Sequence, residues 1–405
     1  MEYTREFNLE KRASPAREEL LAKMDGSPHD NLYPMKIGFK TLTLLRKPPT
    51  LVKAIRRLRS DEAVLSDYEG SNVTPRAFKI CDLPFTPNHQ SLLATNDGTR
   101  IIALTLGRNR SFPIRDMDAD HLWYVYEGSG TCFTDLGPFP YRAGDLVYVP
   151  RLILSHFAPN NPTRLVGIQS EKGLRLPSSR PYDNIEIPFD ECALQVPMPD
   201  VIEAPDVRTV HVRRGGVWSE VEYAYSPFQC VAWKGKLYPF AIHTSKLNFA
   251  STQSVHPDPS NFTVFASPDA SAVVSVLGPR REHSLPYHHL NEWDEVLFMA
   301  RRYGARKGSS GGVGDSGTMT LHPQGVFHGP QMAAVENWKR PESPEQHPWV
   351  NDLAIMFETR APLCLCKDAE PILIEGYEKS WFESWKEYQS RHPTVMGGVG
   401  GWGGW

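Results

Sequence analysis

The sequence has few cysteines, no long apolar run and no excess of charge of one sign. Nowhere do about 18 uncharged apolar residues follow one another, which argues against a membrane-spanning helix. The 44 lysines and arginines nearly balance the 47 aspartates and glutamates, so the basic excess typical of nucleic-acid-binding proteins is missing. The first residues are charged and contain no apolar segment of a secretory signal. We therefore expect a cytoplasmic protein that binds neither nucleic acid nor membrane.

The six cysteines are scattered along the chain. Only Cys364 and Cys366 lie close together, and a C-x-C pair fits neither a zinc knuckle nor a redox C-x-x-C motif. We therefore expect free thiols in a reducing compartment rather than a disulfide framework.

Turn-forming and aromatic residues are abundant, with 30 glycines, 35 prolines, 10 tryptophans, 15 tyrosines and 18 phenylalanines. This mixture disfavours both disorder and long helices, and it favours β structure with many turns. Short apolar segments between turns, such as Ile101–Leu106, Ala272–Leu277 and Asp352–Glu358, predict the strands of a sandwich or barrel. Helices are predicted only at Thr50–Arg59 and Gly376–Ser390.

Two β-rich clusters repeat a pattern of a glycine, a proline six residues later and then a histidine: Gly144, Pro150 and His156, and again Gly317, Pro323 and His328. The repetition predicts an all-β protein with two barrel or sandwich units and a C-terminal helix. The predicted domains are an N-terminal β domain at 1–240 with its barrel core at about 95–175, a second barrel at 241–376, and a helix with a Gly/Trp-rich tail at 377–405.

The second cluster contains residues that suit a metal ion. His289 and Glu295 are six positions apart, so on an extended strand their side chains lie on one face. His328 follows the turn after the partner strand and can complete the set. Two imidazoles and one carboxylate leave three octahedral positions open, as in non-haem Fe(II) oxygenases. These are the predicted ligands, although a bulge would exchange His288 for His289.

The same residues carry a family resemblance. Gly317, Pro323, Gly325 and His328 resemble the second cupin motif, and His289 with Glu295 resembles the first. Within the cupins, several runs resemble homogentisate dioxygenase: Pro286-Tyr-His-His-Leu-Asn291, the nine residues from His256, Met356-Phe-Glu358, and Tyr377-x3-Trp381. The likeness spans roughly residues 100–385.

The resemblance implies a dioxygenase that uses Fe(II) and O2 to open the ring of homogentisate in tyrosine or other aromatic catabolism. It implies that His256 is the active-site base that deprotonates a substrate hydroxyl. It also implies a homo-oligomer, a trimer or a hexamer, and a substrate pocket lined by Tyr287, Tyr303, His322 and His328.

Two alternatives stay open. Leu290 stands where the family usually has arginine, which motivates a related bicupin dioxygenase acting on gentisate, hydroquinone or an aminophenol. A non-catalytic bicupin that binds a metal or small ligand is the other alternative. In the first barrel, aligning Tyr124–Gly128 with the usual cupin strand leaves Arg115 and Met117 at the histidine positions, which predicts that this barrel holds no metal.

Overall fold

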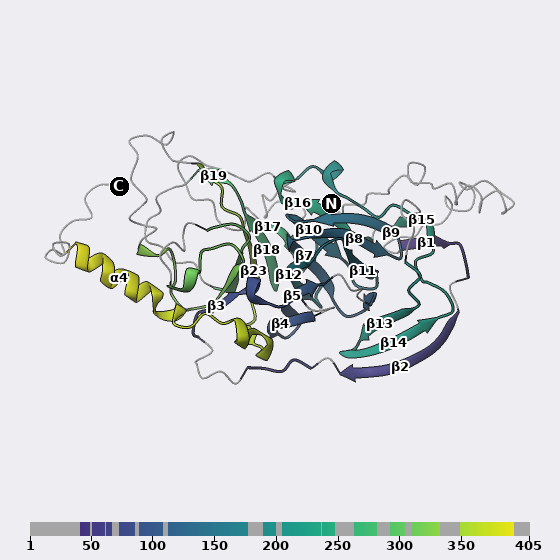
Figure 1. The fold of residues 1–405 in the computed structure, drawn as a ribbon, viewed down its shortest axis with the longest axis horizontal. Coiled ribbons are helices and arrows are strands. Elements are labelled where there is room, and N and C mark those ends of the chain that lie inside the picture. Colours follow the sequence, from purple (N-terminus) through teal and green to yellow (C-terminus); the bar gives the residue numbers. More distant parts are fainter. Residues whose placement is uncertain are drawn as a thin grey trace.

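The protein is described by a computed structural model. It describes residues 41–48, 51–60, 62–66, 73–85, 89–107, 112–176, 189–199, 205–235, 237–247, 263–281, 292–303, 310–332 and 349–392. Within these residues the chain forms three large β-sheets and a single α-helix, α4 (Ser380–Arg391), which confirms the predicted all-β fold class (Figure 1). No helix in this part of the chain is long and apolar enough to cross a membrane.

The first seven-stranded sheet lies in the middle of the molecule. Its antiparallel strands run in the order β16 (Phe240–His243), β10 (Asp145–Val149), β7 (Asp120–Glu127), β12 (Thr163–Ser170), β5 (Thr99–Leu106), β4 (His89–Asn96) and β24 (Cys364–Leu365). Both faces are buried: on β7, Trp123 and Val125 point into one apolar cluster while Leu122 and Tyr124 point into another. The central sheet is therefore packed on both sides.

The second seven-stranded sheet covers one face of the first. Its order is β2 (Val52–Ser60), β14 (Val217–Tyr223), β13 (Thr209–Arg214), β6 (Ile114–Asp116), β11 (Leu154–Pro159), β8 (Ser129–Thr134) and β9 (Gly137–Arg142). The apolar cluster between the two sheets joins Trp123 and Leu165 of the first to Cys132, Phe139 and Phe157 of the second. Together these sheets form the first barrel-like unit.

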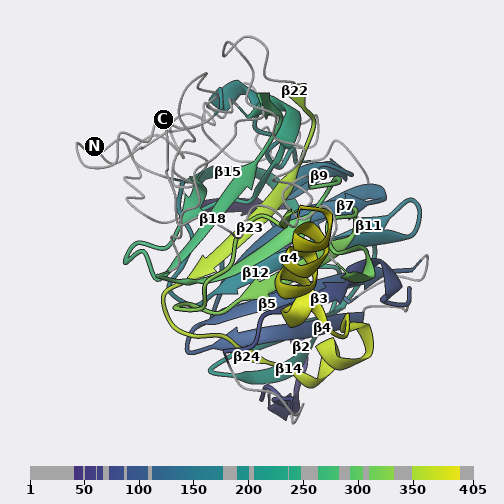
Figure 2. The ribbon, with the colours of Figure 1, turned by 90° about the vertical axis from the view of Figure 1, so that its left-hand side faces the viewer.

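The third sheet covers the opposite face of the first. Its six antiparallel strands run in the order β17 (Thr263–Ala266), β18 (Ala272–Leu277), β23 (Ala354–Thr359), β20 (Asp294–Met299), β21 (Thr318–His322) and β3 (Arg76–Lys79). Val296 and Phe298 face the central sheet, whereas Leu297 and Met299 face a smaller cluster that also contains Tyr377. Helix α4 lies on this outer side, as Figure 2 shows.

The remaining elements are short. Two-stranded sheets pair β1 (Thr41–Leu45) with β15 (Cys230–Gly235), and β19 (Arg280–Arg281) with β22 (Trp349–Val350). Single turns of 3-10 helix are η2 (Ile80–Asp82), η3 (Glu191–Ala193), η4 (Thr244–Lys246), η7 (Ser310–Gly312), η9 (Lys367–Ile372) and η10 (Tyr377–Lys379).

Strands are exchanged between the two halves of the chain. β3, from the N-terminal part, pairs with β21 in the third sheet, and β24, from the C-terminal part, pairs with β4 in the first sheet. Because each sheet includes a strand from the other half, the two units are held together by backbone hydrogen bonds as well as by apolar packing. The division at residues 240 and 376 stays a prediction.

The helix predicted at Gly376–Ser390 is confirmed, since η10 and α4 cover this segment. The helix predicted at Thr50–Arg59 is wrong: this segment forms the exposed strand β2, antiparallel to β14. Arg56 of β2 pairs at 2.6 Å with Glu220, which stands directly opposite it in the ladder. Lys53 reaches Glu222, which stands opposite its neighbour Ala54, at 3.4 Å. Tertiary pairing has overridden a local pattern that was equally compatible with a helix.

Candidate metal centre

Glu295 enters the site from β20, of which it is the second residue. Its position follows the alternation of Leu297 and Met299, so its side chain lies on the face turned away from the central sheet. Across the ladder, Glu295 stands directly opposite His322, the last residue of β21. Directly opposed residues of an antiparallel pair present their side chains on the same face, which brings these two groups together.

His322 is completely buried and has a protein partner on each ring nitrogen. Its Nδ1 lies 2.8 Å from Glu295 Oε1, and its Nε2 lies 2.8 Å from the hydroxyl of Tyr377. The two contacts fix both the position and the rotation of the imidazole.

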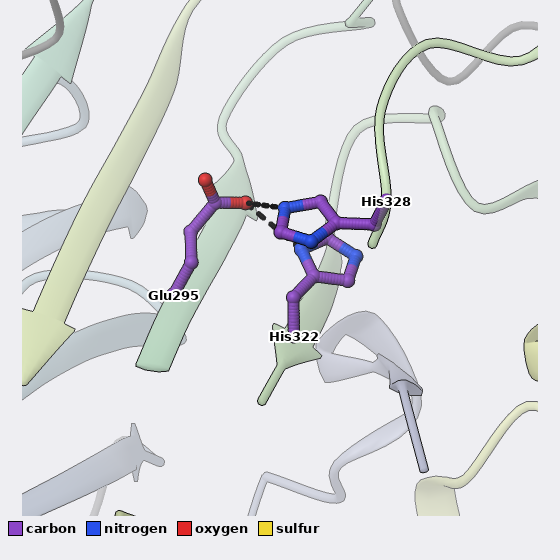
Figure 3. Close-up of side chains that lie close together, drawn as sticks. All are labelled: Glu295, His322 and His328. Atoms are coloured by element: carbon purple, nitrogen blue, oxygen red, sulfur yellow. Dashed lines mark hydrogen bonds and ion pairs between the residues drawn. The ribbon is translucent and has the colours of Figure 1, made fainter. Parts of the chain in front are cut away.

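His328 comes from the loop after β21 (Figure 3). Gly325 takes the left-handed conformation in this loop, with φ +76°, and turns the chain back towards β20. The His328 ring stacks on His322 with centroids 4.1 Å apart, and its Nε2 lies 3.6 Å from Glu295 Oε1. Its Nδ1 donates to the carbonyl of Val326 at 3.2 Å, and its Nε2 is the ring nitrogen that faces the carboxylate.

The carboxyl of Glu295 is held in its charged form. Burial raises its pKa, but the hydrogen bond from His322 and the contact with His328 outweigh burial, so the pKa lies well below its usual value. A carboxylate beside an imidazole nitrogen is a pair of donors suited to a divalent metal ion.

The donor geometry fits a metal. Glu295, His322 and His328 form the group of His, Cys, Asp or Glu within the described ranges whose ligand atoms all lie within 4.8 Å of one another. Two donors each about 2.1 Å from one ion stand roughly 3 to 4 Å apart, which the Glu295–His328 separation of 3.6 Å satisfies. The second ring nitrogen of His328 donates a hydrogen bond to a backbone carbonyl, an interaction that commonly orients metal-binding histidines. His322 differs, since both its nitrogens already have protein partners.

Several predicted site residues lie outside the described residues: His256, Tyr287, His288 and His289. Of the predicted ligands, the structure therefore brings together Glu295 and His328. His322, predicted as a pocket residue, joins them through its hydrogen bond to the carboxylate.

Tyr303, also predicted for the pocket, packs at the edge of the cluster formed by Leu297, Met299 and Met356. Its backbone N–H donates to Gly314 at 2.8 Å, which anchors the segment after β20. Its contact with a substrate stays a prediction.

From the sequence, Trp381 and Trp385 are predicted to form a packing face, and neither Tyr377 nor Trp381 is predicted as a site residue, although both touch the site. The Tyr377 hydroxyl meets His322, and the Trp381 indole packs edge-on against the same imidazole at 5.9 Å. Their i, i+4 spacing at the start of a helix was a usable signal, because such residues lie on one helix face. This spacing indicates that the two rings contact the same neighbouring residue.

The first barrel uses its histidine differently. His121 Nε2 lies 2.8 Å from Asp116 Oδ2, and the guanidinium of Arg213 lies 3.2 Å from the same carboxylate oxygen. Glu127, six residues after His121, forms an ion pair with Arg164. His121 and Glu127 therefore belong to two separate ion-pair groups.

Residues 245–391 match the family model described as Homogentisate 1,2-dioxygenase C-terminal. This part of the chain is similar to the C-terminal region of the homogentisate dioxygenase family. The matched segment contains Glu295, His322, His328 and Tyr377, so every residue of the described centre lies within the homogentisate dioxygenase region. The family resemblance carried by the sequence motifs is confirmed for this region.

Curated relatives agree with the family model. Homogentisate 1,2-dioxygenase of Rhizobium rhizogenes is 32% identical over 203 residues, covering 46% of this chain and 43% of the relative. The enzyme of the same name from Bradyrhizobium diazoefficiens is 25% identical over 293 residues, covering 68% of this chain and 64% of the relative. A protein of Saccharolobus solfataricus with a provisional dioxygenase name is 27% identical over 285 residues, covering 67% and 70%.

The chain thus spans less than half the length of the Rhizobium relative and about two thirds of the other two. Among solved structures, similarity extends to a cupin 2 conserved barrel domain protein from Leptotrichia buccalis. The TM-score is 0.33 at 10% identity, covering 70% of this chain and 95% of that one. The Escherichia coli protein Ylba gives a TM-score of 0.34 at 9% identity, covering 74% and 93%.

Proposed function

We propose that this protein is an Fe(II)-dependent dioxygenase that cleaves the ring of homogentisate and yields maleylacetoacetate. The observation that carries the proposal is the 3.6 Å approach of Glu295 Oε1 and His328 Nε2 inside the segment that matches the homogentisate dioxygenase family. In the balanced reaction one substrate molecule and one O2 give one product, and both oxygen atoms enter that product.

In this proposal Glu295, His328 and His289 hold the metal. Ferrous iron supplies open coordination positions and the electrons that make O2 reactive towards an aromatic ring. His322 keeps the Glu295 carboxylate in place through its 2.8 Å hydrogen bond. The Val326 carbonyl does the same for His328 by accepting from its second ring nitrogen.

His256 is proposed as the base for the substrate phenol. An imidazole has an unperturbed pKa near 6.5, so it accepts a proton near neutral pH and can hold it close to the ionised hydroxyl. Tyr287 and Tyr303 are proposed to line the pocket, with the two histidines of the centre, His322 and His328, at its base.

The experiment is an oxygen-uptake assay with anaerobically prepared, Fe(II)-loaded protein. Homogentisate, gentisate, hydroquinone and an aminophenol are each mixed with it, O2 is added, and the product spectrum is recorded. We expect one O2 consumed per homogentisate. Turnover of gentisate but not homogentisate would make gentisate the substrate in place of homogentisate. Binding of iron without turnover of any phenol would favour a non-catalytic, metal-binding bicupin.

The assembly and location that accompany the resemblance, a homo-oligomeric trimer or hexamer in the cytoplasm, are part of the same proposal. Size-exclusion chromatography with light scattering tests the assembly directly. A monomer at micromolar concentration would contradict it.

A further inference from the structure

The segment from η10 into α4 makes side-chain hydrogen bonds to the two chain segments that carry the site. Tyr377 contacts His322 at the end of β21. Three more bonds reach the loop after His328: Trp381 Nε1 donates to the Gly329 carbonyl at 2.8 Å, Gln331 Nε2 to Ser380 Oγ at 2.9 Å, and the Met332 N–H to Ser384 Oγ at 3.1 Å.

Two of these contacts reach a residue that is directly connected to a proposed metal ligand, in one case by a hydrogen bond and in the other by the chain. His322 holds the carboxylate of Glu295, and Gly329 is the residue directly after His328. The same helix end therefore supports both ligands, the carboxylate through Tyr377 and the imidazole through Trp381. Figures 2 and 3 show α4 on the outer side of the third sheet and the two histidines stacked beside Glu295.

The direction of each hydrogen bond follows from chemistry. A metal-binding carboxylate only accepts, so Nδ1 of His322 donates to Glu295. The other nitrogen of a neutral imidazole then accepts, so the Tyr377 hydroxyl donates to Nε2. Loss of this hydroxyl would leave a completely buried nitrogen without its 2.8 Å donor and would release the ring that aims at the carboxylate.

We infer that the segment Tyr377–Ser384 is a positioning element of the metal centre, in which Tyr377 acts on Glu295 through His322. The inference rests on the proposed metal site at Glu295 and His328, and it deepens that proposal. It assigns to the C-terminal helix a role in metal affinity beyond packing. Outer residues that orient metal ligands typically change metal affinity or activity by about 10- to 100-fold when removed.

The test is a double-mutant cycle read by Co(II) affinity, followed by visible absorption without substrate or O2. The variants are Tyr377→Phe, His322→Asn and the double variant, because an asparagine amide retains a donor near the Nδ1 position. Tyr388→Phe is the matched control, since it removes a hydroxyl from the same helix where the ring stacks on Trp385 and His392.

We expect Tyr377→Phe to weaken Co(II) binding by at least about tenfold. In the His322→Asn background the same change should have less than about a twofold effect, because the relay is already broken. Tyr388→Phe should bind Co(II) as the unchanged protein does. Equal losses in both backgrounds would overturn the inference, as would unchanged affinity in a folded Tyr377→Phe protein.

Trp381→Phe tests the contact that supports His328, and it replaces Tyr377→Phe as the test if that variant does not fold. It removes the indole donor to Gly329 and keeps an aromatic ring, so Co(II) affinity should again fall about tenfold. Unchanged affinity in this folded variant would overturn the inference for the His328 branch. Failure of the proposed function looks different: the unchanged protein would then bind no metal, or would bind Co(II) and Fe(II) and convert no phenol.

Discussion

The ring of Phe298 meets that of Tyr126 edge to face, with centroids 5.2 Å apart and planes at 87°. Phe298 lies on β20, and Tyr126 is the penultimate residue of β7 in the central sheet. β20 also carries Glu295, three residues earlier and on the opposite face. The strand that presents the carboxylate is therefore anchored from behind by the first barrel.

Phe298→Ala should destabilise the protein by about 3 to 5 kcal/mol, because a fully buried ring is replaced by a cavity between two sheets. Chemical denaturation of the metal-free protein measures this change. Phe382→Ala is the control: Phe382 is 60% exposed, so its removal should cost under about 0.5 kcal/mol. Equal small losses for the two variants would contradict the anchoring role.

Metal binding should stabilise the fold through Glu295. Fe(II) or Co(II) at a free concentration of 100 times its dissociation constant should add about 2.7 kcal/mol to the free energy of unfolding. Glu295→Gln should abolish this increment, because a neutral amide is a poor ligand for a divalent ion. Anaerobic thermal unfolding with and without the metal checks both statements, and Glu292→Gln, at an exposed neighbouring position, should retain the full increment.

The buried ion-pair group of the first barrel predicts sensitivity to acid. Burial raises the pKa of Asp116, but the hydrogen bond with His121 and the charges of His121 and Arg213 outweigh it, so the pKa falls below its usual value. A carboxyl whose pKa is lower in the folded state than in the unfolded state stabilises the fold above about pH 4, and this contribution is lost as the pH falls further.

Asp116→Asn should therefore cost about 3 kcal/mol at pH 7, since it leaves the guanidinium of Arg213 with one fewer buried anion. The difference from the unchanged protein should shrink as the pH is lowered from about 5 to 2. Urea unfolding across this range measures it. Asp206→Asn, at an exposed ion pair with Arg208, should change stability little at any pH, because solvent screens this pair. A constant Asp116→Asn penalty would argue against the linkage.

Substitution by alanine should destabilise the protein to different extents at the two glycines of the second cupin-like motif. Both adopt the left-handed conformation, with φ +85° at Gly317 and +76° at Gly325, so each substitution costs about 1 to 2 kcal/mol of backbone strain. A Cβ at Gly317 would also lie 2.8 Å from Tyr126 Oη and 3.1 Å from Cys81 Cβ, whereas nothing lies within 4 Å at Gly325. Gly317→Ala should cost about 1 to 3 kcal/mol more than Gly325→Ala in equilibrium unfolding, and equal losses would contradict the crowding at Gly317.

Much of the fold and of the centre was predictable because the signals are local. Alternation along Glu295–Met299 places the carboxylate on one face of a strand, and the Gly317 to His328 spacing predicts a strand, a turn and a second donor. The strand β2 was not predictable in the same way, because its residues suit a helix equally well and only the pairing with β14 decides between the two.

The relay from Tyr377 through His322 to Glu295 also escaped sequence reasoning. Tyr377 and His322 are 55 positions apart, and His322 and Glu295 are 27 apart. No periodicity connects residues at such separations, since their approach depends on how the third sheet packs against η10 and α4.

The sequence by itself determined the β architecture, the spacing of the candidate donors, and the similarity of residues 245–391 to the homogentisate dioxygenase family, because short-range alternation, turn glycines and motif order are local features of the chain. Only the tertiary structure decided that β3 and β24 exchange between sheets, that His322 meets Glu295, and that the start of the C-terminal helix contacts the chain segments beside them. These relationships arise where distant segments meet in a packed interior, where burial makes each polar group find a specific partner.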